Sequence, residues 1–376
     1  MAKIMVAMSG GVDSSLAAAL LHEAGHDVTG VTLHLWEGDD ERLKESLCCS
    51  QEMTESARRV CAQLGIPYYV FNYQREFRKY VIDYFLKEYS QGFTPNPCLE
   101  CNREVKFRAL LARAQALGFD YVATGHYARI RPTTDDRRPT TDDPCTAGPP
   151  WPPLAPYQLL RAVDADKDQS YMLHMLQQGD LARLLFPIGE YSKLDVRAMA
   201  ARRGLASADR PESQDICFVP GGDYRNLLIE ERPTSLRPGP IVDQQGRELG
   251  QHNGLPLYTI GQRKGLGIAA GQPLYVTQLD VARNAVVVGP RAALERDSLA
   301  AGGVTFVSGG WPAAPFDCLA QIRSHASPVA ARVTPGAPGN IRVVFTRPQH
   351  AITPGQAIVL YDGDIVLGGG RISSEF

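Results

Sequence analysis

Hydrophobic and polar residues follow two alternating patterns in the first third of the chain. Short apolar runs, typical of buried strands, are separated by longer segments whose apolar residues recur every three or four positions, as in amphipathic helices. Strands are expected at Ile4–Met8, Val28–His34, Tyr68–Phe71 and Tyr121–Thr124, with helices at Ser14–Ala24, Gln51–Leu64, Glu76–Tyr89 and Val105–Leu117. This alternation predicts an α/β domain on a doubly wound parallel sheet, with its ligand site at the carboxyl ends of the strands.

The pattern changes after about Val219, where glycine and proline separate short strand-like runs. Asp362-Gly363 lies between two such runs and is a strong hairpin signal, and Val276–Leu279 with Ala285–Val288 forms another expected hairpin. This part is therefore expected to form two small all-β, barrel-like domains. The expected domains are residues 1–217, 218–278 and 279–376, and the first contains a proline-rich insertion at 132–156 that is expected to be disordered.

Composition narrows the class of protein. The hydrophobic fraction of 44% is ordinary for a soluble globular protein, no apolar stretch approaches the ~20 residues that span a bilayer, and no signal peptide is recognisable. A cytoplasmic enzyme without a membrane partner is expected. The net charge of −2 argues against a simple polycationic nucleic-acid binder but allows local basic patches. Eight cysteines in such a chain indicate redox, metal or nucleophilic chemistry rather than a disulfide scaffold.

A turn rich in glycine and serine, Ser9-Gly10-Gly11-Val12-Asp13-Ser14-Ser15, joins the first expected strand to the first expected helix. Its glycines let backbone N–H groups approach an anion, and the helix N-terminus adds the positive end of its dipole. It lacks the Gly-Lys-Ser/Thr ending of a Walker A loop. The turn resembles instead the PP-loop of ATP pyrophosphatases, which cleave ATP between the α- and β-phosphates and adenylate a carbonyl oxygen.

Two cysteine-containing segments are further candidates for chemistry. Cys98 and Cys101 form a CxxC that is expected in a proline-rich loop before a helix. Structural zinc, a redox pair, an iron–sulfur site with Cys217 as third thiolate and a nucleophilic thiol are the alternatives. Cys101 precedes a helix that holds Arg103 and Lys106, where a thiolate is stabilised. Cys217 taken alone is typical of a buried structural cysteine; together with an adenylating loop and a second reactive cysteine, it becomes a candidate persulfide carrier.

Nearly the whole chain resembles the bacterial tRNA-specific 2-thiouridylases, a family of the PP-loop superfamily that makes 2-thiouridine at the wobble position of tRNA. The resemblance depends on many motifs in order: Ala7–Ser14, Asn96-Pro97, Cys101-Asn102, Thr124–Arg129, Lys167–Tyr171, Ser213–Phe218, Tyr258–Gly267 and Pro354–Gln356. It implies an α/β PP-loop domain followed by two β domains, ATP as a substrate with Mg²⁺, and tRNA as a partner. A persulfide donor, either a cysteine desulfurase or a sulfur-relay protein, is also implied.

The same resemblance implies roles for individual residues. ATP contacts fall on Ala7, Met8, Ser9, Gly10, Gly11, Val12, Asp13, Ser14, Leu33 and Gly125. Cys101 is the implied nucleophile, and Cys217 is the implied persulfide carrier, able to form an alternate disulfide with Cys101. The target base falls near Asn96, Pro97 and Cys98, although some members have Asp at the position of Cys98. Contacts with tRNA fall on His126, Lys167, Asp168, Gln169, Arg323, Ser324 and Gln356.

The implied reaction is chemically coherent. The C2 oxygen of uridine is a poor leaving group, and adenylation makes it part of AMP; Mg²⁺, with Asp13 as a candidate to hold it, would neutralise the pyrophosphate. The persulfide sulfur then reaches C2 by direct attack, or as hydrosulfide released when Cys101 attacks the persulfide. Three alternatives remain: an iron–sulfur-dependent thiolase using Cys98, Cys101 and Cys217, a PP-loop amidating ligase acting on a small acid, and a non-catalytic tRNA-binding module. The sequence leaves open which tRNAs are modified and what Cys48-Cys49 does.

Overall fold

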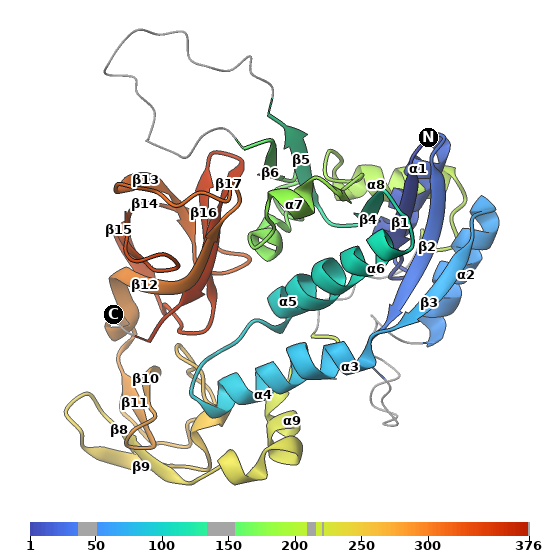
Figure 1. Ribbon diagram of the computed structural model, residues 1–376. Helices are drawn as coiled ribbons and strands as arrows, with labels where there is room; N and C mark the ends of the chain where they lie inside the picture. Colours follow the sequence, from blue (N-terminus) through green and yellow to red (C-terminus); the bar gives the residue numbers. More distant parts are fainter. Residues whose placement is uncertain (37–50, 134–154, 209–215, 220–221, 375–376) are drawn as a thin grey trace, which may run out of the picture.

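The computed structural model describes residues 1–36, 51–133, 155–208, 216–219 and 222–374. Within these residues, the N-terminal part is built on a five-stranded parallel sheet with strand order β3-β2-β1-β4-β7 (Figure 1). Its strands are β1 (Lys3–Ala7), β2 (Asp27–His34), β3 (Tyr68–Asn72), β4 (Tyr121–Thr124) and β7 (Leu184–Leu185). The chain starts in the middle and winds outward in both directions, which confirms the expected doubly wound sheet.

Successive side chains of β1 pack on opposite faces of this sheet. Ile4 and Val6 belong to an apolar cluster shared with helices α1 (Val12–Glu23), α2 (Gln51–Leu64) and α8 (Lys193–Arg202). Met5 belongs to a second cluster, which the remaining long helices cover. Because strand side chains alternate between faces, a strand that is apolar throughout must be covered on both sides, and this is why Ile4–Met8 was recognisable as a buried strand.

Two long helices cover the second face and point toward the other domains (Figure 1). The first runs through α3 (Gln74–Phe77), a π-helical stretch and α4 (Asp83–Ser90), and the second through α5 (Pro97–Glu100), another π-helical stretch and α6 (Leu110–Ala116). A π turn shifts the phase of a helix, so residues outside the predicted 3.6-residue stripe also become buried. Phe77, Val81 and Phe85, spaced four residues apart, are buried, and so are Ile82 and Leu86, each one position further along.

The middle of the chain forms a smaller β unit. Helix α9 (Tyr224–Glu231) leads into a four-stranded sheet of order β10-β11-β8-β9, formed by β8 (Gly239–Val242), β9 (Glu248–His252), β10 (Tyr275–Asp280) and β11 (Ala285–Gly289). The expected hairpin of Val276–Leu279 with Ala285–Val288 is present as β10 and β11. The expected boundary between residues 278 and 279 falls within β10, because the ladder with β11 keeps both strands in this sheet.

The C-terminal part is a closed six-stranded barrel, so the expected all-β fold is confirmed. The barrel strands are β12 (Glu295–Phe306), β13 (Phe316–Gln321), β14 (Val329–Pro335), β15 (Ile341–His350), β16 (Ala357–Asp362) and β17 (Ile365–Ile372). Their order is β12-β15-β14-β13-β16-β17, and pairing of β12 with β17 closes the ring. The Asp362-Gly363 turn joins β16 to β17, and Gly363 has a φ of 55°, which the tight turn requires.

A two-stranded ribbon from the N-terminal part extends this barrel sheet. Strands β5 (Ala128–Pro132) and β6 (Tyr157–Arg161) pair with each other, and Leu160 of β6 pairs with Ile365 of β17. The ribbon is the base of the expected insertion: Pro132 ends β5, whereas residues 134–154 lie outside the described part of the chain. The phenol of Tyr171 further joins the parts, donating a 2.8 Å hydrogen bond to the carbonyl oxygen of Ala357.

The middle unit is attached to the first long helix by aromatic and charged contacts. Tyr89 and Tyr224 stack with ring centroids 4.2 Å apart, and both nitrogens of the Arg78 guanidinium fork donate 2.8 Å hydrogen bonds to the Glu231 carboxylate. All three parts of the chain therefore meet around those ends of the two long helices that point away from the parallel sheet. No helix within the described residues has the length and apolar character needed to cross a membrane.

Candidate active site

The glycine-rich turn lies between β1 and α1, as the strand–turn–helix pattern predicted. Gly10 has a φ of 77°, and a side chain there would overlap the carbonyl oxygen of Met53 in α2. Ser14 accepts a 3.1 Å hydrogen bond from the amide of Ser9, which folds the turn back on the first helical turn. Gly11 is the N-cap residue, and it has no side chain to occupy the N–H groups of that turn. The turn is thus shaped to present backbone donors to an anion.

The carboxyl ends of three neighbouring strands meet at this turn. In the sheet register Ala7 lies beside Val31 and beside Thr124, so β1, β2 and β4 end at one edge. Gly125 follows β4 directly, and a Cβ placed on it would lie 2.6 Å from the amide nitrogen of Ser14. Leu33 lies near the end of β2. The structure thus brings together the residues expected to contact ATP, and their contact with ATP stays a prediction.

Asp13, in the first turn of α1, is held by two groups from elsewhere in the chain. The ammonium of Lys193 donates to both carboxylate oxygens, at 2.7 and 2.8 Å, and the phenol of Tyr127 donates to Oδ1 at 2.8 Å. Both carboxylate oxygens of Asp13 thus accept hydrogen bonds in the structure, and the expected role of Asp13 toward Mg²⁺ stays a prediction. Among the described residues, no group of three or more His, Cys, Asp or Glu side chains could hold a metal ion.

The CxxC segment lies inside a helix, and the expectation of a loop was wrong. Helix α5 begins at Pro97, and the Asn96 side chain accepts hydrogen bonds from the amides of Cys98 and Leu99. An Asn N-cap followed by Pro at the first position is a strong start signal for a helix, and it overrides the loop character suggested by the prolines. Cys98 is exposed, whereas Cys101, one turn further along, is buried in the apolar cluster on the second face of the sheet.

Two asparagines fix this helix against the segment that follows Lys167-Asp168-Gln169. The amide of Asn102 donates a 3.0 Å hydrogen bond to the carbonyl of Met172, and the amide of Asn96 lies 3.8 Å from the sulfur of the same residue. The Oδ1 atom of buried Asn102 has no hydrogen-bond partner in the described structure. The two asparagine contacts hold the helix that carries Cys98 and Cys101 against Met172.

Cys217 lies in a short described segment, residues 216–219, that packs on the same cluster as Cys101. The adjacent Phe218 is the anchor: its ring meets those of Phe77 and Phe85 edge-on, with centroids 5.7 and 5.3 Å away. Cys217 itself is half-buried. Residues 209–215, which include the first three residues of the motif that begins at Ser213, lie outside the described part of the chain. The partnership of the two cysteines stays a prediction.

Three of the seven residues expected to contact tRNA line one pocket at the junction of all three parts. Arg323, Ser324 and Gln356 of the barrel line a pocket of about 630 Å³, together with Thr94 before α5 and Thr259–Gly261 of the middle unit. Gln356 donates a 2.9 Å hydrogen bond to the carbonyl of Thr94, so it holds the segment that leads into the CxxC helix.

Lys167, Asp168 and Gln169, also expected at the tRNA, lie outside this pocket. The Asp168 carboxylate accepts from the amides of Ala162 and Ser170, and the Gln169 side chain accepts a 2.9 Å hydrogen bond from the amide of Tyr127. These side chains therefore shape the turn beside the PP-loop, and their contact with tRNA stays a prediction.

His126 follows Gly125 and packs between Phe107 and Phe186, with ring centroids 5.7 and 6.0 Å away. Its Nδ1 lies 2.7 Å from the hydroxyl of Thr124. Burial, with a smaller contribution from the positive charge of Lys106, lowers the pKa of His126 to about 3. The imidazole is therefore neutral at physiological pH, and any contact with tRNA would be a neutral hydrogen bond or stacking.

This pKa predicts how stability depends on pH. In the unfolded chain the imidazole binds a proton below about pH 6.5, whereas in the folded protein it stays neutral down to about pH 3. The free energy of unfolding should fall as pH drops through this window. Relative to His126→Asn, we expect the wild type to lose about 2 kcal/mol between pH 7.5 and 5. Urea unfolding of both proteins at the two pH values measures this difference, and an equal change in both would contradict the assignment.

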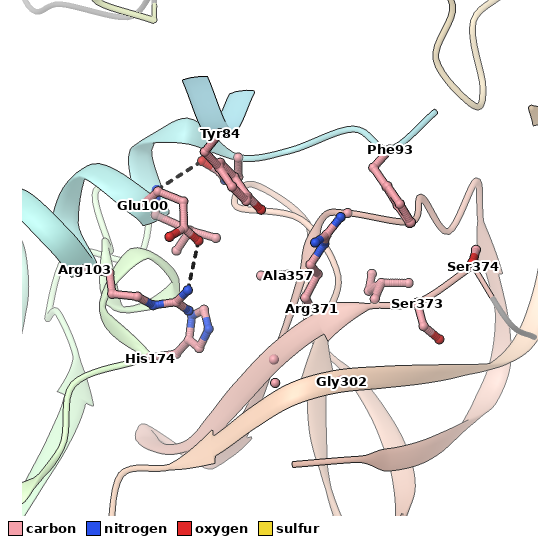
Figure 2. Close-up of a pocket in the computed structure, with 16 residues that line it drawn as sticks. Tyr84, Phe93, Glu100, Arg103, His174, Gly302, Ala357, Arg371, Ser373 and Ser374 are labelled. Atoms are coloured by element: carbon pink, nitrogen blue, oxygen red, sulfur yellow. Dashed lines mark hydrogen bonds and ion pairs between the residues drawn. The ribbon is translucent and has the colours of Figure 1, made fainter. Parts of the chain in front are cut away.

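A second pocket, of about 470 Å³, lies between the CxxC helix and the barrel. Figure 2 shows Glu100 and Arg103 of the helix on one side and Gly302 and Arg371 of the barrel on the other. Burial raises the pKa of Glu100, whose carboxylate pairs with Arg103 at 2.9 Å. At the edge of this pocket, Arg371 forms an ion pair with the buried carboxylate of Glu88 in α4. Its guanidinium lies 4.4 Å from the ring centroid of Phe93.

Removing Arg371 should loosen the barrel from the helices. Removing one partner of a buried ion pair lowers the free energy of unfolding by about 3–5 kcal/mol. Because Arg371 is partly exposed, we expect Arg371→Met to lower it by about 2 kcal/mol. Arg332→Met removes an exposed pair with Asp317 on the same barrel and should cost under about 1 kcal/mol. Denaturant unfolding compares them. If Arg371→Met is no less stable than Arg332→Met, the pair does not join the domains.

Comparison with known proteins identifies the family of this chain. Three family models match in succession: a tRNA methyl transferase HUP domain over residues 2–221, a tRNA methyl transferase PRC-barrel domain over 225–290, and an aminomethyltransferase beta-barrel domain over 296–372. A tRNA-specific 2-thiouridylase MnmA from Roseiflexus sp. (strain RS-1) is 78% identical, with all of both chains covered. The chain belongs to the MnmA family. MnmA proteins of Chloroflexus aurantiacus and Moorella thermoacetica are 61% and 51% identical, with at least 98% of each chain covered.

Two residues of this MnmA site were missed from the sequence. Lys193 and Tyr127 contact the PP-loop carboxylate, although neither lies in a glycine-rich or cysteine motif. Tyr127 stands inside Thr124–Arg129, which the resemblance already singled out, so a signal for it existed. For Lys193 the only local signal is Ser192 with Asp195, a capping box that predicts a helix start but no function.

Proposed function

We propose that this protein catalyses ATP-dependent 2-thiolation of the wobble uridine of tRNA, yielding 2-thiouridine, AMP and pyrophosphate. The observation that carries the proposal is that a chain of the MnmA family has an intact PP-loop, and that the helix containing Cys101 packs through Phe107 on His126, directly after Gly125 at that loop. An amidating ligase would need the loop but no cysteine beside it. The proposed enzyme is a tRNA-uridine 2-sulfurtransferase that acts in the cytoplasm.

The PP-loop would perform the first step. The N–H groups at the start of α1, and the hydroxyls of Ser9 and Ser14, are positioned to hold phosphate oxygens while the C2 oxygen of uridine attacks the α-phosphorus. The bond between the α-phosphorus and the bridging oxygen breaks, and pyrophosphate leaves. Mg²⁺ that arrives with ATP would neutralise the phosphates, and phosphate oxygens and water would supply its ligands.

The two cysteines would perform the second step. A persulfide donor, such as a cysteine desulfurase or a sulfur-relay protein, loads sulfane sulfur on Cys217. In one route this terminal sulfur attacks C2 directly. In the other, Cys101 attacks the inner sulfur, hydrosulfide leaves, and a Cys101–Cys217 disulfide remains. In both, the C2–O bond breaks with AMP as leaving group. The direct route also needs a thiol to cleave the resulting S–S bond, and Cys101 would supply it, so both routes end in the same disulfide.

The tRNA would lie across the junction pocket. Asn96, Pro97 and Cys98 would face the target base, which must leave its stack to reach the crevice. Arg323, Ser324 and Gln356 would contact the anticodon arm from the barrel, and Lys167 would add a phosphate contact from the N-terminal part. Residues 1–217 would thus carry the chemistry, and the two β parts would position the RNA.

A second candidate is an iron–sulfur-dependent thiolase. The spacing of Cys98 and Cys101, one helical turn apart, is the observation for it. However, Cys98 is exposed, Cys101 is buried, and no group of three or more His, Cys, Asp or Glu among the described residues could hold a metal ion, so the cluster is not the favoured interpretation. A cluster at Cys98, Cys101 and Cys217 would give the same product. Iron analysis of protein purified without oxygen distinguishes the two, since the persulfide mechanism requires no bound iron.

Mass spectrometry of tRNA nucleosides tests the proposed function. Unmodified tRNA is incubated with the protein, ATP, Mg²⁺ and a persulfide donor, then digested. We expect 2-thiouridine to appear with stoichiometric AMP, and to be absent when ATP or the donor is omitted. Pyrophosphate release without thiolation in the complete mixture would contradict sulfur transfer, and formation of an amide product from ammonia would favour the ligase.

A further inference from the structure

Lys193 is an unusual residue in this fold. It is 8% exposed, and it is the only lysine or arginine of the described residues that is buried. Lysines are almost never buried unless they are paired, because removing an ammonium from water is costly. Its partner here is Asp13 of the PP-loop, reached across 180 positions of sequence. A buried charge at this place needs a reason beyond stability, since an apolar pair would be at least as stable.

The chain holds Lys193 in position through its backbone. Lys193 is the first residue of α8, which begins with a capping box between Ser192 and Asp195. Its amide donates a 2.8 Å hydrogen bond to Asp164, and its ammonium lies 5.6 Å from the ring centroid of Tyr127. Helix α8 packs against α1, the helix that follows the PP-loop. The ammonium is thus fixed beside the first turn of α1, where the N–H groups are presented.

The PP-loop has no lysine of its own. A Walker A loop carries one next to its Ser/Thr, where it contacts the β- and γ-phosphates. Ser9–Ser15 contains no cation, yet a triphosphate brings three to four negative charges to this turn. A carboxylate at the same turn would repel those charges unless a cation accompanied it. Lys193 supplies that cation from a distant helix, and Asp13 holds it in place while the loop is empty.

We propose that Lys193 is the cation that binds the β- and γ-phosphates of ATP and the pyrophosphate that leaves, and that it exchanges one hydrogen bond to Asp13 for a phosphate oxygen. This inference rests on the proposed ATP-dependent function. The charge on the leaving oxygen grows in the transition state, so a fixed ammonium there stabilises the transition state more than the ground state. Asp13 keeps the bond from Tyr127 and remains in the turn.

The test is calorimetric titration of the full chain with inorganic pyrophosphate and, separately, with AMP. Lys193→Met should weaken pyrophosphate binding at least about tenfold while AMP binding stays within about twofold. Lys193→Arg, which keeps the charge, should recover most of the affinity. Lys87→Met removes an exposed lysine from α4 and is the matched control, expected to match the wild type. Unchanged pyrophosphate binding in Lys193→Met, or equal loss of AMP and pyrophosphate, would overturn the proposal.

A double variant separates phosphate binding from simple neutralisation of Asp13. If Lys193 serves only to compensate Asp13, then Asp13→Asn with Lys193→Met removes both charges and should restore pyrophosphate affinity to the wild-type value. The proposal predicts instead that the double variant recovers only part of the affinity and stays well below the wild type, because the repulsion by Asp13 is removed but no cation is supplied. Neither titration needs tRNA or a sulfur donor. A protein that binds pyrophosphate through Lys193 but makes no 2-thiouridine would therefore contradict the proposed function and leave this inference standing.

Discussion

Replacing Gly125 by alanine is expected to abolish adenylation of tRNA while leaving the protein folded. The Cβ would lie 2.6 Å from the amide nitrogen of Ser14 and 2.8 Å from the carbonyl carbon of Asp13, and both are backbone atoms that cannot rotate away. Helix α1 would have to shift from β4, which disturbs the N–H groups that face the nucleotide. Overpacking of this kind costs about 1–3 kcal/mol, or up to about 100-fold in ATP affinity.

Gly179→Ala is the matched control for this substitution. Gly179 lies in the short helix α7 (Gln178–Leu181), and a Cβ there has no atom within 4 Å. Both substitutions add one methyl group, so only the surroundings differ. ATP affinity measured by titration, with a thermal unfolding curve for each variant, makes the comparison. If Gly125→Ala binds ATP as well as Gly179→Ala does, Gly125 does not belong to the nucleotide site.

The strand–helix alternation predicted the sheet because its signals are local. A buried parallel strand must be apolar on both faces, and a phosphate-binding turn needs glycine, so Ile4–Met8 and Ser9–Ser15 were recognisable one after the other. The hairpin at Asp362-Gly363 was equally visible, because its turn geometry depends on the residues that form it. Each of these elements is specified by a dozen consecutive residues or fewer.

Contacts between distant segments had no such signal. Nothing in β6 indicates that Leu160 pairs with Ile365 of the barrel, and nothing near Gln356 indicates that it holds Thr94. The Lys193–Asp13 pair depends on α8 packing against α1, which is a property of the tertiary fold. The start of the CxxC helix was predicted wrongly for another reason. Asn96-Pro97 is a local signal for a helix start, but the nearby prolines suggested a loop.

Substitution of Cys101 and of Cys217 is the strongest test of the proposed sulfur transfer. Cys217→Ser should still form adenylated tRNA but carry no persulfide, since a hydroxyl cannot hold sulfane sulfur, and thiolation should be lost. Cys101→Ser should accept the persulfide on Cys217 yet fail to complete transfer. Intact-protein mass spectrometry detects the added 32 Da of one sulfur atom, and nucleoside analysis detects 2-thiouridine. Together they show at which step each variant stops. Cys318→Ala, a half-buried thiol in β13 of the barrel, is the control and should be fully active.

Cys98 decides between the persulfide and cluster mechanisms. It is exposed in the first turn of α5, where the Asn96 side chain accepts from its backbone amide, so serine leaves the helix cap intact. If Cys98 only shapes the base pocket, Cys98→Ser should lower thiolation about tenfold or less and carry no iron. Loss as complete as in Cys101→Ser, together with loss of bound iron, would establish the cluster. Full thiolation by Cys217→Ser would overturn the persulfide assignment, because no other described cysteine lies beside Phe218 at the cluster shared with Cys101.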